Sequence, residues 1–566
     1  MCRPIGYVLI GFLFLFTGSY TAVSEVFEAR YIDDGAGNKR LLSAKTVSRN
    51  LNLTALNSLL NYSETRFPAS VIEHENPSTE KIVILRSQSQ DAIMTELQKR
   101  QVKDSVPLSD EESFLLADDE VVTIVDSGPA ENRIDVVFMG DGYTVQEKQK
   151  FFSDMQRMVD DMFRDKTFRS YLPLFNIHLV FRASNESGIG KNNIAKDTAY
   201  GLYRGGNTLR AIYPSDKRAL RSSCSKAPGC DYPVVIANDP YYGGLGGEFA
   251  ISTSSVTSGT KVLRHELGHN FGRVGEEYDG GGYFGANYSK RLRNLSWKHW
   301  TTAKNVTAEP AQSRYMAWPW YNLIGGEYVA EFKSDGTASR ASIRLSVSGM
   351  AEDSDLGLTI DGSRLVYRGT GTDDRMFHNY RLDKGFSKGE HQLVFQGPMD
   401  GDDHWISSVH IQEYGSDYNF DPDYIGAFPV FDPKGRVAGY RSNHETCLMR
   451  NMDSPVFCSI CKENNWLQFF DNVELIDSVE TIYNQDFVTV KLNTLKLGQL
   501  YDQNESGSIT VQWLFNGKEI SSFTDQFQWT RPIEKSKGSW QVKVQYRSAE
   551  IRKDLNLFDD TKYIEI

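Results

Sequence analysis

Apolar residues recur at two spacings along the chain. Residues 133–139, 175–181 and 233–236 are short, largely apolar runs that predict buried strands. Thr144 and Glu147 form a capping box that predicts a helix start after the first run. Apolar side chains at the spacing of one helix face follow: Phe151, Met155, Met158, Val159, Met162 and Phe163. A strand, a long helix and further strands predict an α/β domain.

The spacing changes to strict alternation in two later segments. Residues 325–415 alternate between apolar and polar with frequent turns, which predicts an inserted β-sandwich. Residues 471–566 alternate in the same way and predict a C-terminal immunoglobulin-like β domain. Residues 25–128 mix short strand-like runs with polar turns. We interpret them as a β-rich accessory domain, with a removable propeptide as the alternative.

At 566 residues the chain is too long for one core. The patterns predict a multidomain protein in which the catalytic domain has two parts, separated by the insert. The predicted segments are a leader at 1–24, an accessory domain at 25–128, catalytic parts at 129–324 and 416–470, the insert at 325–415 and the last domain at 471–566.

The first 24 residues carry Arg3, an apolar run and then small residues, which is typical of a signal peptide. No later segment is long and apolar enough to span a membrane. We therefore expect a secreted protein, extracellular or periplasmic, without a membrane span in the mature chain. The net charge of −12 argues against a nucleic acid partner.

Five cysteines follow the leader, and an oxidising compartment favours their pairing. Cys224 and Cys230 flank a short turn and are expected to form a local disulfide. Cys447 is expected to pair with Cys458 or Cys461. The alternatives for the Cys458–Cys461 motif are a redox pair or half of a zinc knuckle.

The candidate chemistry lies in residues 265–278, which read HELGHNFGRVGEEY. His265 and His269 are four residues apart, so a helix places both imidazoles on one face, where they can bind one zinc ion. Glu266 lies beside them as a general base. Gly272 is expected to end the helix and to let the chain turn back beneath the metal.

A hydrolytic zinc site needs a third protein ligand. Gly275 stands where a longer form of the motif carries histidine or aspartate. Glu277 is the favoured ligand and Glu276 the alternative, while His299 and His444 are more distant candidates.

Two further segments leave alternatives open. The glycine-rich stretch 243–252 is either an edge strand that pairs with an extended substrate or a surface loop. Trp405 and the acidic turn 400–403 could bind sugar or calcium, or they form a core aromatic residue and a solvated turn.

Together these residues resemble the IgA-peptidase family of secreted zinc metallopeptidases. The motifs that carry the resemblance are 135–144, 184–188, His265 through Tyr278, 297–300, 440–441, 447–450 and 457–461. The resemblance implies a metzincin-like fold, in which Met449 lies as a floor beneath the zinc ligands. The insert at 325–415 departs from the family pattern, so the family's substrate is not carried over.

The expected reaction is hydrolysis of peptide bonds in extracellular proteins, with one catalytic Zn²⁺ and with Glu266 as the base. A rival hypothesis is an exported adhesion or glycan-binding protein on an inactive peptidase scaffold. A third is a zinc amidase that acts on non-protein amides.

Overall fold

The protein is described from a computed structural model of the whole chain. It describes the strands within residues 24–87 and then residues 119–566, except 165, 207–209, 304, 402, 499–506 and 554. The chain divides into two compact units, residues 1–113 and 114–566. The predicted leader, apart from Ser24, lies outside the described residues.

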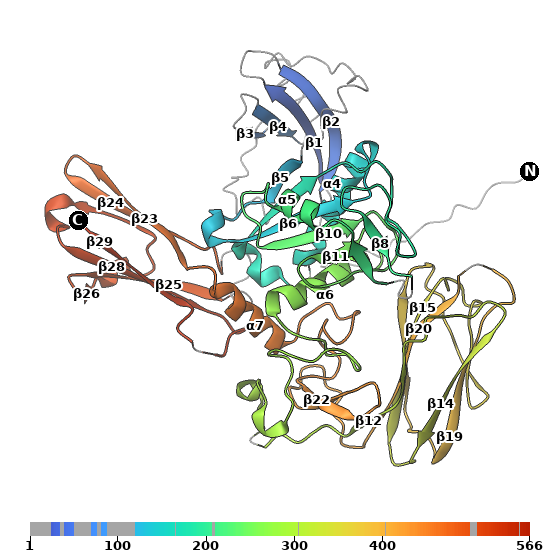
Figure 1. Cartoon of the computed structure of the whole chain (residues 1–566). Helices are drawn as coiled ribbons and strands as arrows, with labels where there is room; N and C mark the ends of the chain where they lie inside the picture. Colours follow the sequence, from blue (N-terminus) through green and yellow to red (C-terminus); the bar gives the residue numbers. More distant parts are fainter. Residues whose placement is uncertain are drawn as a thin grey trace, which may run out of the picture. The chain divides into compact units, whose positions relative to one another are not determined.

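The first unit contains one antiparallel sheet of four strands in the order β2-β1-β4-β3 (Figure 1). These strands are β1 (Ser24–Asp33), β2 (Lys39–Arg49), β3 (Ser70–Glu75) and β4 (Lys81–Ser87). The β-rich character expected for this region is therefore present.

The second unit is built around a five-stranded sheet in the order β11-β10-β6-β7-β5. Its strands are β5 (Glu120–Val125), β6 (Ile134–Asp141), β7 (Phe175–Phe181), β10 (Tyr232–Ala237) and β11 (Ala250–Thr253). All neighbours are parallel except β5, which runs antiparallel to β7. The structure thus places β5 in this sheet, although the sequence suggested a catalytic domain that starts at residue 129.

The described residues of this unit include the helices α4 (Lys148–Arg164), α5 (Lys217–Cys224), α6 (Gly259–Gly272) and α7 (Ser459–Phe470). The predicted capping box of Thr144 and Glu147 is formed, and α4 buries the six side chains of its predicted apolar face. Helix α6 lies near the sheet and α7 lies beside α6 (Figure 1).

Short elements complete the unit. The paired strands are β8 (Leu202–Arg204) with β9 (Ile212–Pro214), and β21 (Phe428–Phe431) with β22 (Val437–Arg441). The 3-10 turns of the described chain are η1 (Ala130–Asn132), η2 (Val145–Glu147), η3 (Arg169–Leu174), η4 (Leu292–Asn294), η5 (Lys298–Trp300), η6 (Ser521–Phe523) and η7 (Ile533–Lys535).

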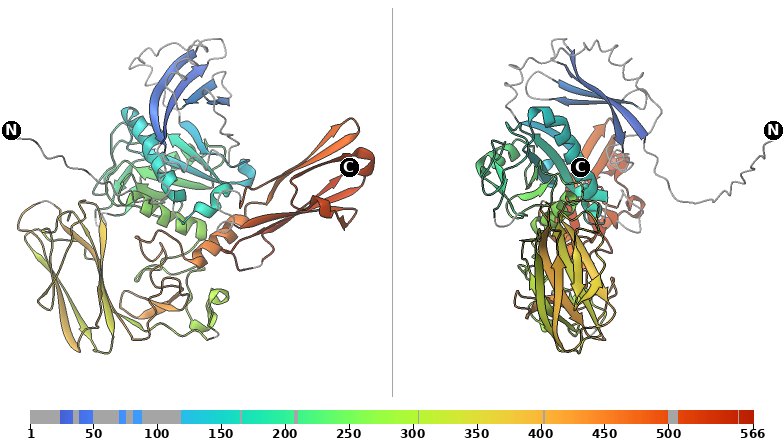
Figure 2. Two further views of the ribbon diagram at one scale, coloured as in Figure 1. Left: turned by 180° about the vertical axis from the view of Figure 1, so that it is seen from behind. Right: turned by 90° about the vertical axis from the view of Figure 1, so that its right-hand side faces the viewer.

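The predicted insert forms two antiparallel sheets that face each other (Figure 2). One contains β12 (Ala311–Ala317), β13 (Tyr321–Asn322), β15 (Arg340–Ser348), β18 (Met376–Leu382) and β20 (Trp405–Tyr414). The other contains β14 (Glu327–Ser334), β16 (Gly357–Ile360), β17 (Ser363–Leu365) and β19 (Gly389–Gln396). Their inner faces share one apolar core.

Strand β12 begins before the predicted insert boundary at residue 325. It pairs with β20, the last strand of the insert. All seven of its side chains are partly buried or exposed. Its sequence, AQSRYMA, therefore needs no apolar residue at every second position and shows no such alternation. The sequence pattern therefore does not predict this strand.

Residues 476–565 form two more antiparallel sheets. The strands are β23 (Ile476–Asn484), β24 (Phe487–Thr494) and β27 (Gln528–Pro532) in one, and β25 (Ser508–Phe515), β26 (Lys518–Glu519), β28 (Ser539–Arg547) and β29 (Asp559–Glu565) in the other. Trp513, Trp529 and Trp540 pack together in their core. The described residues of this segment are therefore β-rich, as their alternation predicts.

Cys224 and Cys230 form the predicted disulfide. Cys447, Cys458 and Cys461 are free and buried, so the second predicted disulfide is absent. Among the described residues, no helix combines the length and apolar character that crossing a membrane requires.

Candidate active site

Helix α6 presents His265 and His269 on one face, as their spacing predicts, with ring centroids 4.8 Å apart. Nδ1 of His265 lies 3.1 Å from the backbone oxygen of Leu448, and Nδ1 of His269 lies 2.8 Å from that of Val274. A carbonyl oxygen only accepts, so each Nδ1 carries the proton. Each Nε2 is then the nitrogen available to a metal ion, which would replace a proton held there.

Glu276 completes this group. Its two carboxylate oxygens lie 3.1 Å from Nε2 of His265 and 3.1 Å from Nε2 of His269. The three donor atoms all lie within 4.8 Å of one another, so they could hold one metal ion. Two imidazoles and a carboxylate are a ligand set that zinc accepts.

Glu277, the carboxylate favoured by the sequence, does not lie with the histidines. Its Oε1 atom accepts a hydrogen bond from Nδ2 of Asn287 at 3.1 Å and faces the three free cysteines. Glu276 and Glu277 therefore belong to different groups of potential ligands. The structure brings the alternative, Glu276, to the histidines.

The conformation of the turn after α6 determines which of the two glutamates lies beside the histidines. Gly272 is the last helical residue, but the left-handed residue is Arg273, with φ of +48°. Gly272 is required for another reason, because a Cβ there would lie 2.8 Å from Oδ1 of Asn465 in α7. The expectation that Gly272 itself makes the turn is therefore wrong, and its small size serves helix packing.

The charged forms of His269 and Glu276 stabilise each other. Burial lowers the pKa of His269, but its hydrogen bond with Glu276 and the charge of that group outweigh burial and raise the pKa to about 9. Burial raises the pKa of Glu276, yet the charge and hydrogen bonds of the histidines hold that pKa well below its usual range. A bound cation would compete with the protons on these groups.

Glu266 lies next to His265 on α6 and lines the same cavity. Burial raises the pKa of its carboxyl above the ordinary value. Gly246 approaches it so closely that a Cβ there would lie 2.6 Å from Oε2 of Glu266. The glycine-rich stretch thus forms one wall beside this carboxylate.

The same stretch covers the outer edge of the sheet. Leu245 exchanges both backbone hydrogen bonds with Ile251 of β11, at 3.1 and 3.0 Å. A substrate strand could therefore not pair with Ile251 directly. Gly244 in turn donates a backbone hydrogen bond to the oxygen of Arg210 at 2.9 Å, so further backbone lies beyond this stretch.

Met449 packs against α6, the helix that carries the two histidines. It is fully buried, and a Cβ added to Gly268 of α6 would lie 2.7 Å from its sulfur atom. Tyr278 stacks beside His265, with ring centroids 6.4 Å apart, and burial followed by the charge of Glu276 raises the pKa of its hydroxyl. Met449 thus packs against the helix that carries the two histidines, and Tyr278 lies beside His265.

The two distant histidines lie elsewhere. His299 pairs with Glu463 of α7. His444 accepts a hydrogen bond from the hydroxyl of Tyr418 at 2.7 Å, within a cluster of aromatic rings. Neither belongs to the group of His265, His269 and Glu276.

Two connected cavities lie between the sheet domain and the insert. The first, which we call the catalytic cavity, has a volume of about 120 Å³ and is lined by His265, Glu266, Glu276 and Tyr278. Its remaining walls include the following residues from the insert and its approach: Trp318, Arg344, Arg375, Phe377 and His410. Sequence patterns gave no sign that these residues face the histidines, because the contact joins distant segments.

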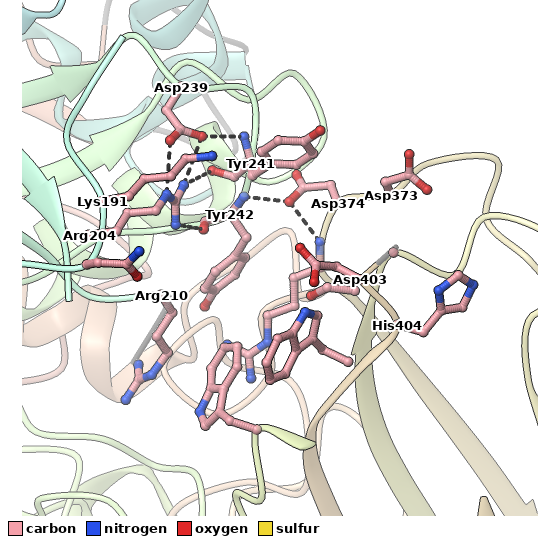
Figure 3. A pocket seen from close by; sticks show the side chains of 16 residues that line it. Lys191, Arg204, Arg210, Asp239, Tyr241, Tyr242, Asp373, Asp374, Asp403 and His404 are labelled. Atoms are coloured by element: carbon pink, nitrogen blue, oxygen red, sulfur yellow. Dashed lines mark hydrogen bonds and ion pairs between the residues drawn. The ribbon is translucent and has the colours of Figure 1, made fainter. Parts of the chain in front are cut away.

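The second, the outer cavity, has a volume of about 900 Å³ (Figure 3). It shares Arg210, Tyr242 and Arg375 with the catalytic cavity. Figure 3 shows Asp239 paired with Arg204 and Asp374 bonded to the backbone of Tyr242. The predicted sugar or calcium residues Trp405 and Asp403 also line it.

No curated protein matches the chain. Among solved structures, a family 35 carbohydrate-binding module from Clostridium thermocellum has 10% identity and a TM-score of 0.12, and the alignment covers 18% of this chain and 90% of that one. A carbohydrate-binding module from a Cellvibrio mixtus lichenase, solved with cellotriose, has 10% identity and a TM-score of 0.13, with 19% and 90% covered.

The family described as IgA Peptidase M64 matches residues 122–328. The matched segment begins within β5, contains α6 and the group of His265, His269 and Glu276, and ends before the Met449 turn. Over these residues the resemblance is confirmed, and the chain carries a peptidase domain of the IgA-peptidase family of metallopeptidases.

Proposed function

We propose that the protein is a zinc-dependent endopeptidase that hydrolyses extracellular proteins. The observation that carries this proposal is the convergence of Nε2 of His265, Nε2 of His269 and the carboxylate of Glu276 beside Glu266. An adhesion protein on an inactive scaffold would have no need of this complete set.

The donor set fits zinc. Both histidines are fixed in the metal-binding tautomer, and Glu276 is the third donor. A zinc ion held there would supply Lewis-acid activation of water and of the scissile carbonyl. The position of Met449 beneath α6 supports the metzincin-like fold as part of the proposal.

Glu266 performs the proton transfers. Its raised pKa suits a base that takes a proton from the attacking water and delivers it to the leaving amine. The lack of a side chain at Gly246 leaves the space that the Glu266 carboxylate occupies beside the glycine-rich wall, and Glu266 also lines the cavity.

The variant Glu266→Gln tests this assignment. We expect unchanged folding and unchanged zinc content, with kcat reduced by roughly 10²- to 10⁴-fold, because only the proton transfer is lost. Glu248→Gln, at an exposed carboxylate paired with Arg221, is the matched control and should retain activity. Wild-type cleavage of a peptide library by Glu266→Gln would contradict the mechanism.

Export is part of the same proposal. The Cys224–Cys230 disulfide supports an oxidising compartment, since such bonds are rare in the cytosol. N-terminal sequencing of protein from the culture medium or periplasm would test it. A mature chain that begins near residue 24 is expected, and retention of Met1 in the cytosol would contradict export.

A second function, glycan binding, is supported by the outer cavity. Trp320 and Trp405 line it, and Nε1 of Trp405 is buried without a hydrogen-bond partner among the described residues. Trp320 also has a φ of +45°, a strained conformation that is often kept at binding sites. Two indole rings in the wall of one cavity suit the apolar face of a sugar ring on a glycosylated substrate.

Binding of glycopeptides and of matching bare peptides to Glu266→Gln separates the two functions. Trp405→Phe removes the indole donor and keeps an aromatic ring. We expect it to weaken glycopeptide binding and to leave bare peptide binding unchanged. Equal binding of both ligand types to the parent would contradict the glycan function and leave the peptidase assignment intact.

A further inference from the structure

A second group of potential metal ligands lies outside the histidine group. It consists of Cys447, Cys458, Cys461 and Glu277, and their ligand atoms all lie within 4.8 Å of one another. Exposure is 0%, 7% and 2% for the cysteines and 1% for Glu277. The four residues come from the loop after α6, the Met449 turn and the start of α7.

The distances in this group match those of a tetrahedral metal site. Zinc–sulfur bonds of about 2.3 Å place two sulfur ligands about 3.8 Å apart, and a carboxylate oxygen about 3.6 Å from each sulfur. The Sγ atoms of Cys447 and Cys461 are 3.8 Å apart. Oε1 of Glu277 lies 3.5 Å from Sγ of Cys461 and 4.0 Å from Sγ of Cys458.

Glu277 is the second, independent sign of a ligand. Its Oε2 atom is buried and has no hydrogen-bond partner in the part of the chain that the structure describes. Burial of a carboxylate without full pairing is unfavourable, because the group loses its hydration. A divalent cation would satisfy this carboxylate and three thiolates together.

A disulfide accounts for the group less well. It would bind two of the three sulfur atoms and leave one buried thiol beside an unsatisfied carboxylate. The observed sulfur separation of 3.8 Å also exceeds a disulfide bond of about 2.05 Å. The chain does form such a bond between Cys224 and Cys230, where the sulfur atoms are bonded.

We propose that Cys447, Cys458, Cys461 and Glu277 bind a second, structural metal ion of the thiolate-preferring class, with zinc as the expected occupant. The site is closed, because four protein ligands leave no position for water or substrate. Its role is to hold the Met449 turn, the Glu276 loop and α7 together.

The backbone around the group supports this role. The N–H of Glu277 donates to the oxygen of Met449 at 3.0 Å, and the adjacent Leu448 accepts from His265. Glu276, the ligand beside the histidines, directly precedes Glu277. An ion at the cysteines would therefore fix the loop that delivers Glu276, without contacting the substrate.

The full chain with His265→Ala and His269→Ala tests the site without the histidine group. After loading with zinc and dialysis against a weak chelator, we expect about one ion per chain to remain. Loading with Co²⁺ should give the intense thiolate-to-cobalt absorption of a sulfur-rich tetrahedral site. Cobalt held by nitrogen and oxygen alone gives no such band, so the result does not depend on the peptidase assignment.

Two further variants in this background complete the test. Cys458→Ser with Cys461→Ser should abolish both the retained ion and the band, whereas Cys224→Ser with Cys230→Ser should preserve both. X-ray absorption of the zinc-loaded parent gives a measurement that needs no cysteine variant, with three sulfur ligands and one oxygen expected. A parent chain that retains no ion, or a peptide map that links Cys447 to Cys458 or Cys461, would overturn the proposal.

Discussion

Two adjacent glutamates, Glu276 and Glu277, point to different partners. One carboxylate lies 3.1 Å from Nε2 of each histidine, and the other faces three sulfur atoms. Neighbouring side chains in extended backbone point to opposite sides, so a single residue step changes the group that each joins. The sequence motif identifies the pair but not the partner of each member.

This separation predicts the result of Glu276→Gln. The amide keeps the shape of the side chain but removes the charge that pairs with His265 and His269. We expect kcat/KM to fall at least about 100-fold, with weaker zinc retention, since even indirect partners of metal ligands contribute 10- to 100-fold. Peptide hydrolysis and zinc titration measure both. Unchanged zinc affinity would show that another residue is the third ligand.

His444 predicts a dependence of stability on pH. Burial, the largest effect, lowers its pKa to about 4, against about 6.5 for an unfolded histidine. Between about pH 4 and pH 6.5, His444 is therefore protonated in the unfolded chain and neutral in the folded chain. The contribution of His444 to stability is therefore full above about pH 6.5, falls by about 3 kcal/mol as the pH drops to 4, and stays lost below that.

His444→Gln should remove this contribution, because it keeps a neutral acceptor for the hydroxyl of Tyr418. Urea unfolding at pH 7 and pH 4 gives the comparison. The loss of unfolding free energy between these pH values should be about 3 kcal/mol smaller in the variant. An identical loss in both proteins would mean that His444 is protonated when folded.

At this scale the sequence predicted the two histidines and Glu266 as neighbours, since helix periodicity alone brings them together. It predicted that Cys447 lies near Cys458 or Cys461, but as a disulfide, and it did not predict that Glu277 joins the three free cysteines. The members of this group come from residue 277 and from residues 447–461, and no local pattern reports that these segments meet. Such a site is revealed by the burial of free cysteines and of an incompletely paired carboxylate in the structure, and not by the spacing of these residues in the sequence.

At the scale of elements, the packing of α6 on the Met449 turn positions the histidines. Gly268 makes this possible, because a Cβ there would lie 2.7 Å from Sδ of Met449 and 2.9 Å from Cε1 of Phe457. The strands β7 and β10 and the helix α4 follow the sequence patterns closely, since each buries a continuous apolar face. Strand β12 does not, because it lacks such a face.

Gly268→Ala should therefore force α6 and the Met449 turn apart. We expect a loss of about 1–3 kcal/mol in unfolding free energy and a lower zinc affinity. Denaturation curves and zinc titration measure both effects. Gly282→Ala is the control, because a Cβ at Gly282 would contact nothing within 4 Å. Equal stability of the two variants would contradict close packing at Gly268.

At the scale of the whole second unit, the insert forms part of the catalytic cavity. Trp318 lies against Gly280, where a Cβ would come within 2.2 Å of the indole ring. Its side chain is nevertheless 41% exposed, so a substrate can reach it. The sequence predicted the sandwich itself, but its contact with the histidine region depends on side chains far apart in the chain.

Trp318→Ala should consequently alter substrate binding. We expect kcat/KM for peptides to fall by about 10-fold or more, mainly through KM, as happens when a central aromatic contact is removed. Zinc content should not change. Tyr563→Ala removes an aromatic ring that is 73% exposed on β29 and serves as the control. A Trp318 variant with wild-type KM would exclude the insert from substrate binding.

The two ends of the insert lie side by side. The N–H of Gly415 donates to the oxygen of Pro310 at 2.8 Å, and β12 pairs with β20. Once the sandwich folds, the chain from Pro310 to Gly415 acts as a short connection. Closing a loop costs less entropy when the loop is shorter. A folded insert therefore lowers the entropic cost of bringing residues 265–277 to residues 447–461, the two segments that supply Glu277 and the three cysteines.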